Sequence, residues 1–132
     1  MSRSADGRKH GDRGSAAVEF ALVLPILLLL VVGMLDFGIT YNHWISLTNL
    51  AHEGVRLASV GPASAGDVQS LAAAYGLDPS KTTATVSSSS SGSLGKYWTV
   101  TVQYPYDLTI PWWGTDGGVI TATARMRDEQ QP

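Results

Sequence analysis

The chain has 132 residues, no cysteine and a formal net charge of −2 at pH 7. This length leaves room for one small domain beside a membrane segment. The near-neutral charge argues against nucleic acid as a partner, and the lack of cysteine excludes a stabilising disulfide.

Met1 to Arg13 is a polar segment without apolar periodicity. This composition predicts a disordered leader, which ends at Gly14 and so spans residues 1–14. The leader carries four basic residues, and they precede an apolar run. Because basic residues stay on the cytoplasmic side of a membrane, we expect the N-terminus inside the cell and the rest of the chain outside.

The run from Ser15 to Leu35 is apolar except for Glu19. As a helix, these residues would reach about 30 Å, the hydrocarbon thickness of a bilayer. We therefore predict a single transmembrane helix over residues 15–36, in the cytoplasmic (inner) membrane. No A-x-A-like cleavage site follows Leu35, which disfavours a secretory signal peptide. A carboxylate inside such a helix is costly, so Glu19 is expected to have a partner.

The helical pattern continues outside the membrane over residues 37–61 and should end near Val60, where Gly61 and Pro62 follow. Alternate spacings of four and three residues place one stripe on a single helix face, where it can pack on other helices. Asp36, at the outer membrane boundary, is interpreted as a solvated interfacial residue. The stripe consists of Phe37, Tyr41, Trp44, Thr48, Ala51, Val55 and Ala58.

Residues 62–132 are predicted to form a small extracytoplasmic head. Helical spacing from Asp67 to Tyr75 predicts a short helix, and period-two alternation predicts strands at 82–88, 96–104 and 119–127. The apolar face of this sheet should pack on residues 48–58 or on the short helix. The core-facing residues of the two clearest strands are Trp98, Val100, Val102, Tyr104, Ile120, Ala122, Ala124 and Met126.

The fold class is therefore α+β: a long N-terminal transmembrane helix with a small antiparallel sheet of about three strands and one short helix. The serine run 87–91 predicts a flexible hairpin loop. Pro105 and Pro111 are expected to interrupt the chain after the second strand, and residues 112–118 to form a turn-rich loop. Trp112 and Trp113 in that loop are explained equally well as an exposed binding tip or as cover for the small core.

The inventory for catalysis is poor. The chain has no cysteine, and His43 and His52 fall off a common helix face. No nucleophile elbow, H-E-x-x-H motif, P-loop or dinucleotide fingerprint is present. We expect no enzymatic activity, no metal, no cofactor and no small-molecule substrate.

Several motifs together carry a family resemblance. Gly14 is followed five residues later by Glu19 and then by the aromatic Phe20, Pro25 comes six residues after the Glu, and Glu-Gly-Val-Arg stands at 53–56. The sequence resembles the TadE-like family, minor pseudopilins of the tight-adherence (Flp-type) pilus, closely over about residues 13 to 60 and only in outline beyond. The resemblance implies a pilin-like fold.

The resemblance also implies roles for particular residues. Prepilin peptidase would cut between Gly14 and Ser15, where the missing Cβ of glycine lets an extended backbone approach an active site. Glu19, with Phe20 beside it, would serve assembly by pairing with the terminal ammonium of a neighbouring subunit. The helix stripe would pack on other pseudopilins or on assembly platform proteins. Glu53 and Arg56 would contribute a subunit contact, although their spacing alone is explained by a surface ion pair.

Two hypotheses about the function of this chain are compatible with the predicted topology. In the first, the chain is a processed pseudopilin that takes part in pilus assembly, in the membrane or in the fibre. In the second, it is an unprocessed single-pass anchor whose head binds another envelope protein, and Glu19 extends to the cytoplasmic headgroups. The two hypotheses differ at the Gly14–Ser15 bond.

Overall fold

The computed structural model describes residues 9–91, 95–110 and 114–128. The three strands form one antiparallel sheet in the order β1-β2-β3. This arrangement confirms the predicted α+β fold with one long helix, one short helix and a small sheet. The elements are α1 (Lys9–Val60), α2 (Ala65–Leu71), the 3-10 helix η1 (Ala72–Tyr75), β1 (Thr83–Ser91), β2 (Gly95–Ile110) and β3 (Gly114–Arg127).

Helix α1 is continuous over 52 residues and passes through Pro25. Its end at Val60 confirms the prediction from Gly61 and Pro62. Its start at Lys9 corrects the prediction of a disordered leader for residues 9–13. The costly step in helix formation is nucleation, and the apolar segment supplies the nucleus, so the helix extends upstream one residue at a time at little cost. Residues 1–8 lie outside the described residues.

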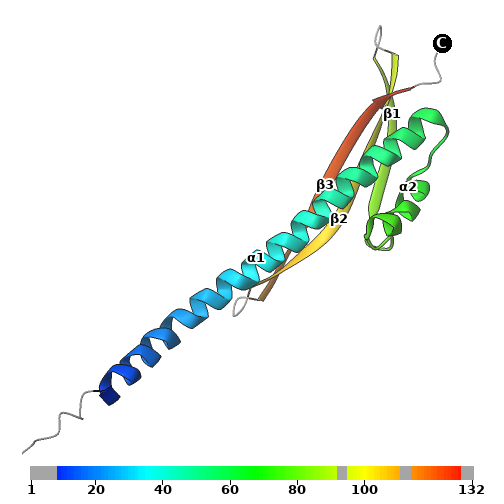
Figure 1. The fold of residues 1–132 in the computed structure, drawn as a ribbon. Helices are drawn as coiled ribbons and strands as arrows, with labels where there is room; N and C mark the ends of the chain where they lie inside the picture. The colour runs from blue at the N-terminus through cyan, green and yellow to red at the C-terminus, as the bar shows by residue number, and fades with distance from the viewer. Residues whose placement is uncertain (1–8, 92–94, 111–113, 129–132) are drawn as a thin grey trace, which may run out of the picture.

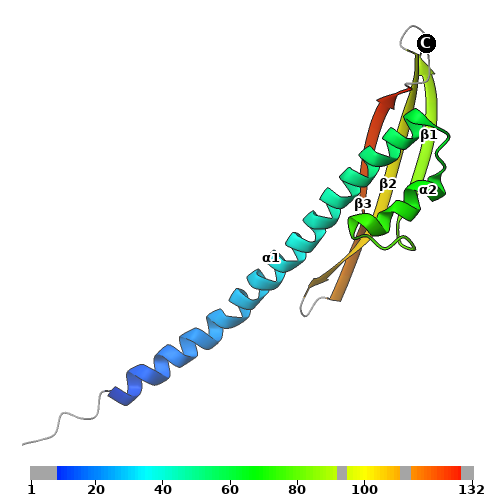
Figure 2. The same cartoon turned by 45° about the vertical axis from the view of Figure 1, so that its right-hand side comes forward.

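The sheet lies mainly along the C-terminal half of α1, whereas most of the N-terminal half projects beyond the head (Figures 1 and 2). The apolar face of the sheet therefore packs on α1, and α2 with η1 covers the core from the side of β1. Both predicted partners of the sheet are thus used. The buried core consists of Leu47, Leu50, Ala51, Val55, Ala58, Val68, Ala72, Leu77, Val100, Val102, Tyr104, Ala122 and Ala124.

The short helix begins two residues before the predicted start and has a complete capping box. The Ser64 hydroxyl accepts a hydrogen bond from the backbone N–H of Asp67, and the Asp67 carboxylate accepts one from the backbone N–H of Ser64 at 2.8 Å. These bonds satisfy groups that a helix N-terminus would otherwise leave without partners. At the other end, Gly76 adopts a φ of 73°, a left-handed conformation that glycine reaches without strain.

Strand β1 includes the serine run, which corrects the prediction of a loop there. Its pairing with β2 continues from Ser87 opposite Thr99 to Ser91 opposite Gly95. β1 is an edge strand, so small polar side chains can occupy it while the backbone pairing with β2 supplies the hydrogen bonds. The paired strands of this hairpin are therefore longer than the composition indicated.

Strands β2 and β3 also extend beyond their predicted ends. β2 continues through Pro105 to Ile110, and β3 starts at Gly114, inside the predicted loop. The pairing of β1 with β2 begins with Thr83 opposite Gln103, so Pro105 lies where one edge of β2 is open. Proline is compatible with such an edge because no third strand needs its missing N–H. Pro111, Trp112 and Trp113 lie outside the described residues.

Gly54 brings α1 close to both of its neighbours in the core. A Cβ at this position would lie 3.0 Å from Val68 Cγ1 and 3.2 Å from Val100 Cγ1. Both valines are fully buried and have stiff, branched side chains, so neither can easily move away. The missing side chain of Gly54 thus fixes how closely α1 packs on α2 and β2.

We expect Gly54→Leu to lower the free energy of unfolding of the full chain in detergent micelles by about 2–3 kcal/mol, because the added atoms overpack the core. The matched control is Gly38→Leu on the same helix, where a Cβ meets nothing within 4 Å. The control should stay within about 1 kcal/mol of the wild type. Denaturant unfolding followed by tryptophan fluorescence measures both variants, and equal stability of the two would contradict this account of Gly54.

Candidate functional site

The residues implied in processing and assembly lie together on the projecting part of α1. Gly14, Ser15, Glu19 and Phe20 are all exposed. Ser15 and Glu19 are one helical turn apart on the same face, and the Ser15 hydroxyl donates a long hydrogen bond of 3.4 Å to Glu19 Oε1. The Glu19 carboxylate is therefore next to the point where the chain would begin after cleavage at Gly14.

The projecting part of α1 has an apolar surface that the chain itself leaves uncovered. Every residue from 14 to 31 is exposed, and Leu22, for example, has 70% of its surface accessible. In the described part of the chain, one helix is long and apolar enough to span a membrane, and it lies within Gly14–Val60. Lipid or other apolar helices must cover this surface, because water would leave a large apolar area exposed.

The stripe of seven residues is buried in the head at one end and exposed at the other. At its C-terminal end, Ala51, Val55 and Ala58 are buried in the chain's own core. At its N-terminal end, Phe37 is 71% exposed and Trp44 is 46% exposed. The part of the stripe that is open to another molecule therefore ends near Thr48, whose hydroxyl donates to the Trp44 carbonyl oxygen at 2.8 Å.

The three aromatic residues of the stripe form a continuous stack on the helix surface. The ring centroids of Phe37 and Tyr41 are 6.2 Å apart, and those of Tyr41 and Trp44 are 5.8 Å apart. Stacked rings of this kind hold one another in place and present a broad, stiff apolar surface. This surface lies just beyond the predicted membrane boundary, where amphipathic rings are favoured.

The sequence interpretation missed the two largest helix residues in the core, Leu47 and Leu50. They lie on the sheet side of the stripe, and with Gly54 and Ala58 they follow spacings of three and four residues. This second stripe could have predicted which face of α1 packs on the sheet. That face lies beside the face that carries the aromatic rings, and the two faces do not coincide.

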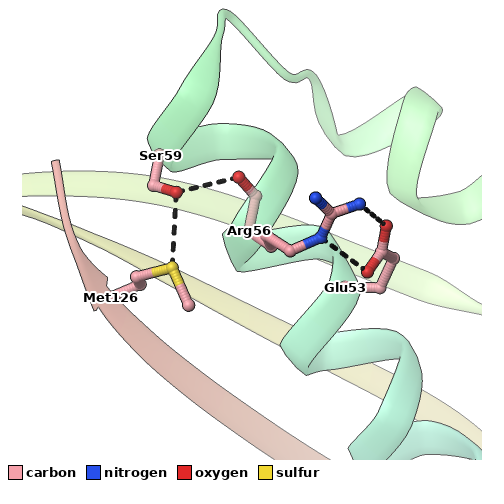
Figure 3. Close-up of polar contacts among 4 residues, drawn as sticks. All are labelled: Glu53, Arg56, Ser59 and Met126. Carbon is pink, nitrogen blue, oxygen red and sulfur yellow. Dashed lines mark hydrogen bonds and ion pairs between the residues drawn. The ribbon is translucent and has the colours of Figure 1, made fainter. Parts of the chain in front are cut away.

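The Glu-Gly-Val-Arg segment divides between the core and the surface. Gly54 and Val55 are buried, whereas Glu53 and Arg56 form a bidentate pair outside: Arg56 Nη2 lies 2.6 Å from Glu53 Oε1, and Arg56 Nε donates to Glu53 Oε2 at 3.0 Å (Figure 3). The Arg56 guanidinium holds the pKa of the Glu53 carboxyl below its ordinary value of 4.5, chiefly through these hydrogen bonds. The segment thus combines close helix packing with an ordered surface pair.

Ser59 ties the same turn of α1 to strand β3. Its hydroxyl donates to the Arg56 carbonyl oxygen at 2.8 Å and lies 3.3 Å from Met126 Sδ (Figure 3). Ser59 is fully buried, so this bond satisfies a polar group that would otherwise be costly in the core. The turn that carries the Glu53–Arg56 pair is therefore held firmly against the sheet.

No group of three or more His, Cys, Asp or Glu side chains that could hold a metal ion occurs in residues 14–90, 95–110 and 114–128. The ring of His43 packs against the ring of Tyr104, with centroids 5.1 Å apart. His52 is exposed on α1.

Comparison with known proteins identifies the anchor region. Residues 14–56 match the model of the TadE-like protein family, which confirms the resemblance over the projecting helix and its extension into the head. The match indicates an envelope protein associated with the tight-adherence pilus and anchored in a membrane by α1. Neither a search of curated proteins nor a search of solved structures finds a match to this chain.

We expect Glu53→Gln to lower the free energy of unfolding of the full chain in micelles by about 0.5 kcal/mol at neutral pH, since it removes one exposed ion pair. The folded state holds this carboxyl below its ordinary pKa of 4.5. Its stabilisation is therefore complete above that value and is lost as the pH falls through the lowered pKa.

The difference between wild type and Glu53→Gln should accordingly vanish in acid, well below the lowered pKa of this carboxyl. The control is the same substitution in an Arg56→Gln background, which already lacks the pair and should show no difference at either pH. Thermal unfolding at the two pH values provides the measurement. A difference that persists in acid would mean that Glu53 stabilises the fold by another route.

Proposed function

We propose, from the match of residues 14–56 to the TadE-like family, that this chain is a pseudopilin-like protein that takes part in assembly of a tight-adherence pilus. In this proposal, prepilin peptidase cuts the Gly14–Ser15 bond, and the exposed part of α1 packs with other pseudopilins or with assembly platform proteins. The head stays outside the cytoplasmic membrane. The observation that carries the proposal is the uncovered apolar helix with Glu19 one turn beyond the proposed cleavage point.

Glu19 has a clear electrostatic purpose in such an assembly. A carboxylate in an apolar helix is unfavourable alone, and in a medium of low dielectric it attracts a cation strongly. Cleavage at Gly14 would create an ammonium at Ser15, and each subunit would then carry both members of an ion pair near one end of its helix. A pair between the Ser15 ammonium of one subunit and Glu19 of the next would set their axial register.

The aromatic stack supports a second contact in the same assembly. Phe37, Tyr41 and Trp44 are exposed and lie on one side of α1, beside the face that the sheet covers. A neighbouring helix packed there would bury all three rings without disturbing the core of the head. Glu53 and Arg56 lie farther along the same helix and would border this contact.

One observation favours the rival function, an unprocessed envelope anchor whose head binds another envelope protein. Helix α1 begins at Lys9, so the Gly14–Ser15 bond lies inside a helix and not in an extended segment. A peptidase would have to unwind the first turns of α1 to reach it. Gly11 and Gly14 lower the cost of that unwinding, because glycine favours the helix less than other residues do.

Processing is tested by N-terminal sequencing of the membrane-bound protein from cells with and without prepilin peptidase. We expect a terminus at Ser15 that depends on the peptidase, and an intact leader in a Gly14→Val variant. The matched control is Gly11→Val, which changes a leader glycine away from the bond and should be processed normally. An intact leader in both strains would favour the unprocessed anchor.

Assembly through Glu19 is tested by co-purification of a tagged chain with the other pilus proteins. We expect Glu19→Ala to insert in the membrane and to be processed normally. The amount of pilus protein that co-purifies with it should fall by about tenfold or more, because the Ser15 ammonium loses its counter-charge. Asp116→Ala removes an exposed carboxylate from β3, away from the proposed helix contacts, and is the control. Normal co-purification of Glu19→Ala would sink the proposed role of this residue.

A further inference from the structure

The end of the β2–β3 hairpin reaches past the head and lies against the part of α1 that is predicted to enter the membrane. Leu108, Thr109 and Ile110 of β2 share the walls of a hollow with Leu29, Val32 and Gly33 of α1. Along α1, Val32 and Asp36 are less exposed than the residues around them, which agrees with cover from the hairpin. The head therefore overlaps the outer part of the apolar segment.

Two adjoining hollows separate the hairpin end from α1. The one nearer the head, of about 390 Å³, is bordered by Asp36, Thr40 and His43 of α1, by Lys81 and by residues 104–107. The one nearer the membrane centre, of about 140 Å³, is bordered by residues 29–36 of α1 and 108–110 of β2. Asp36 borders both hollows, and we refer to the two hollows together as the groove.

The chemistry of the groove changes along its length. The hollow nearer the head contains one cation, Lys81, and two carboxylates, those of Asp36 and Asp107. Within the described part of the chain, no ion pair joins Lys81 to either carboxylate. The hollow nearer the membrane centre is lined almost entirely by carbon, from Leu29, Val32, Leu108 and Ile110. The groove is thus polar at its outer end and apolar at its inner end.

This order, and the length of the groove along α1, match the headgroup end of one lipid of the outer leaflet. From Leu29 to His43 the helix rises about 21 Å, close to half the thickness of a bilayer with its headgroups. The groove is continuous with the membrane-spanning surface of α1, so a lipid can enter it from the side. A headgroup would lie between Lys81 and Asp107, and the upper part of an acyl chain would lie between Val32 and Leu108.

We propose that this groove binds one amine-bearing zwitterionic phospholipid, of the phosphatidylethanolamine kind. Lys81 would contact the phosphate, and the carboxylates of Asp36 and Asp107 would accept hydrogen bonds from the ammonium. An anionic headgroup would meet two carboxylates against one lysine, and a choline headgroup has no N–H to donate. This proposal rests on the membrane anchor and not on cleavage at Gly14.

The test is native mass spectrometry of the full chain, reconstituted in vesicles of phosphatidylethanolamine, phosphatidylcholine and phosphatidylglycerol in equal parts and then released in mild detergent. We expect one retained lipid, with phosphatidylethanolamine enriched about tenfold over each of the others, since hydrogen bonds between charged groups select it. Equal retention of the three lipids, or enrichment of phosphatidylglycerol, overturns the proposal.

Two sets of variants separate headgroup from chain recognition. Lys81→Ala with Asp107→Asn should abolish the enrichment, whereas the control pair Lys96→Ala with Asp116→Asn, whose side chains border neither hollow, should keep it. Gly33→Leu fills the apolar hollow at a position where a Cβ meets nothing within 4 Å, and should reduce retention of every lipid, with Gly38→Leu as its control.

Enrichment that survives Lys81→Ala with Asp107→Asn would overturn the assigned headgroup contacts. A protein could instead occupy the groove. In that case, a photo-crosslinker at Thr40 would label a second polypeptide in the membrane and no lipid would be retained. This result would also overturn the proposal. Because these readouts require no pilus and no peptidase, the result is independent of the assembly proposal.

Discussion

The structure depends on one helix that has two duties. Three strands and a short helix bury few apolar residues among themselves, and the head is too small to be stable without another element to complete its core. That element is the C-terminal part of α1, where Leu47, Leu50 and Val55 are fully buried against the sheet. The same helix, without interruption, provides the apolar anchor. The fold of the head and its position relative to the membrane are therefore set by a single rigid element.

The sequence predicted the parts of the fold that obey a strict period. Val100, Val102, Ala122 and Ala124 alternate with polar residues along their strands, and they face the core as predicted. The long helix was predicted as well, because its apolar run and its terminators are both strong signals. The predictions of loops that rested on amino-acid composition alone were wrong. Serines were interpreted as a loop, yet Ser87 pairs with Thr99 in the sheet, because pairing depends on the neighbouring strand and not on the serines themselves.

The candidate site shows the same division. The spacing of Gly14, Ser15 and Glu19 is a local property of one helix, and the family match covers these positions. Which residues of the stripe remain exposed depends on how the sheet is placed, and no period in the helix reveals that. The hairpin end is the clearest case. Tyr106 lies across Gly118, where a Cβ would come within 2.7 Å of its ring, so the glycines interpreted as a turn are needed for a close cross-strand contact.

The shared helix also determines how the head responds to mechanical load. A pull on α1 along its axis enters the head through the side chains between Leu47 and Ala58, and the strands run alongside this stretch of the helix (Figure 2). Such a load acts in shear on the contacts between α1 and the sheet. These contacts must all break together when the helix slides along the sheet, and they cannot break one after another. Close packing at Gly54 strengthens these contacts. A protein pulled through its anchor would thus resist extension along the axis of that helix.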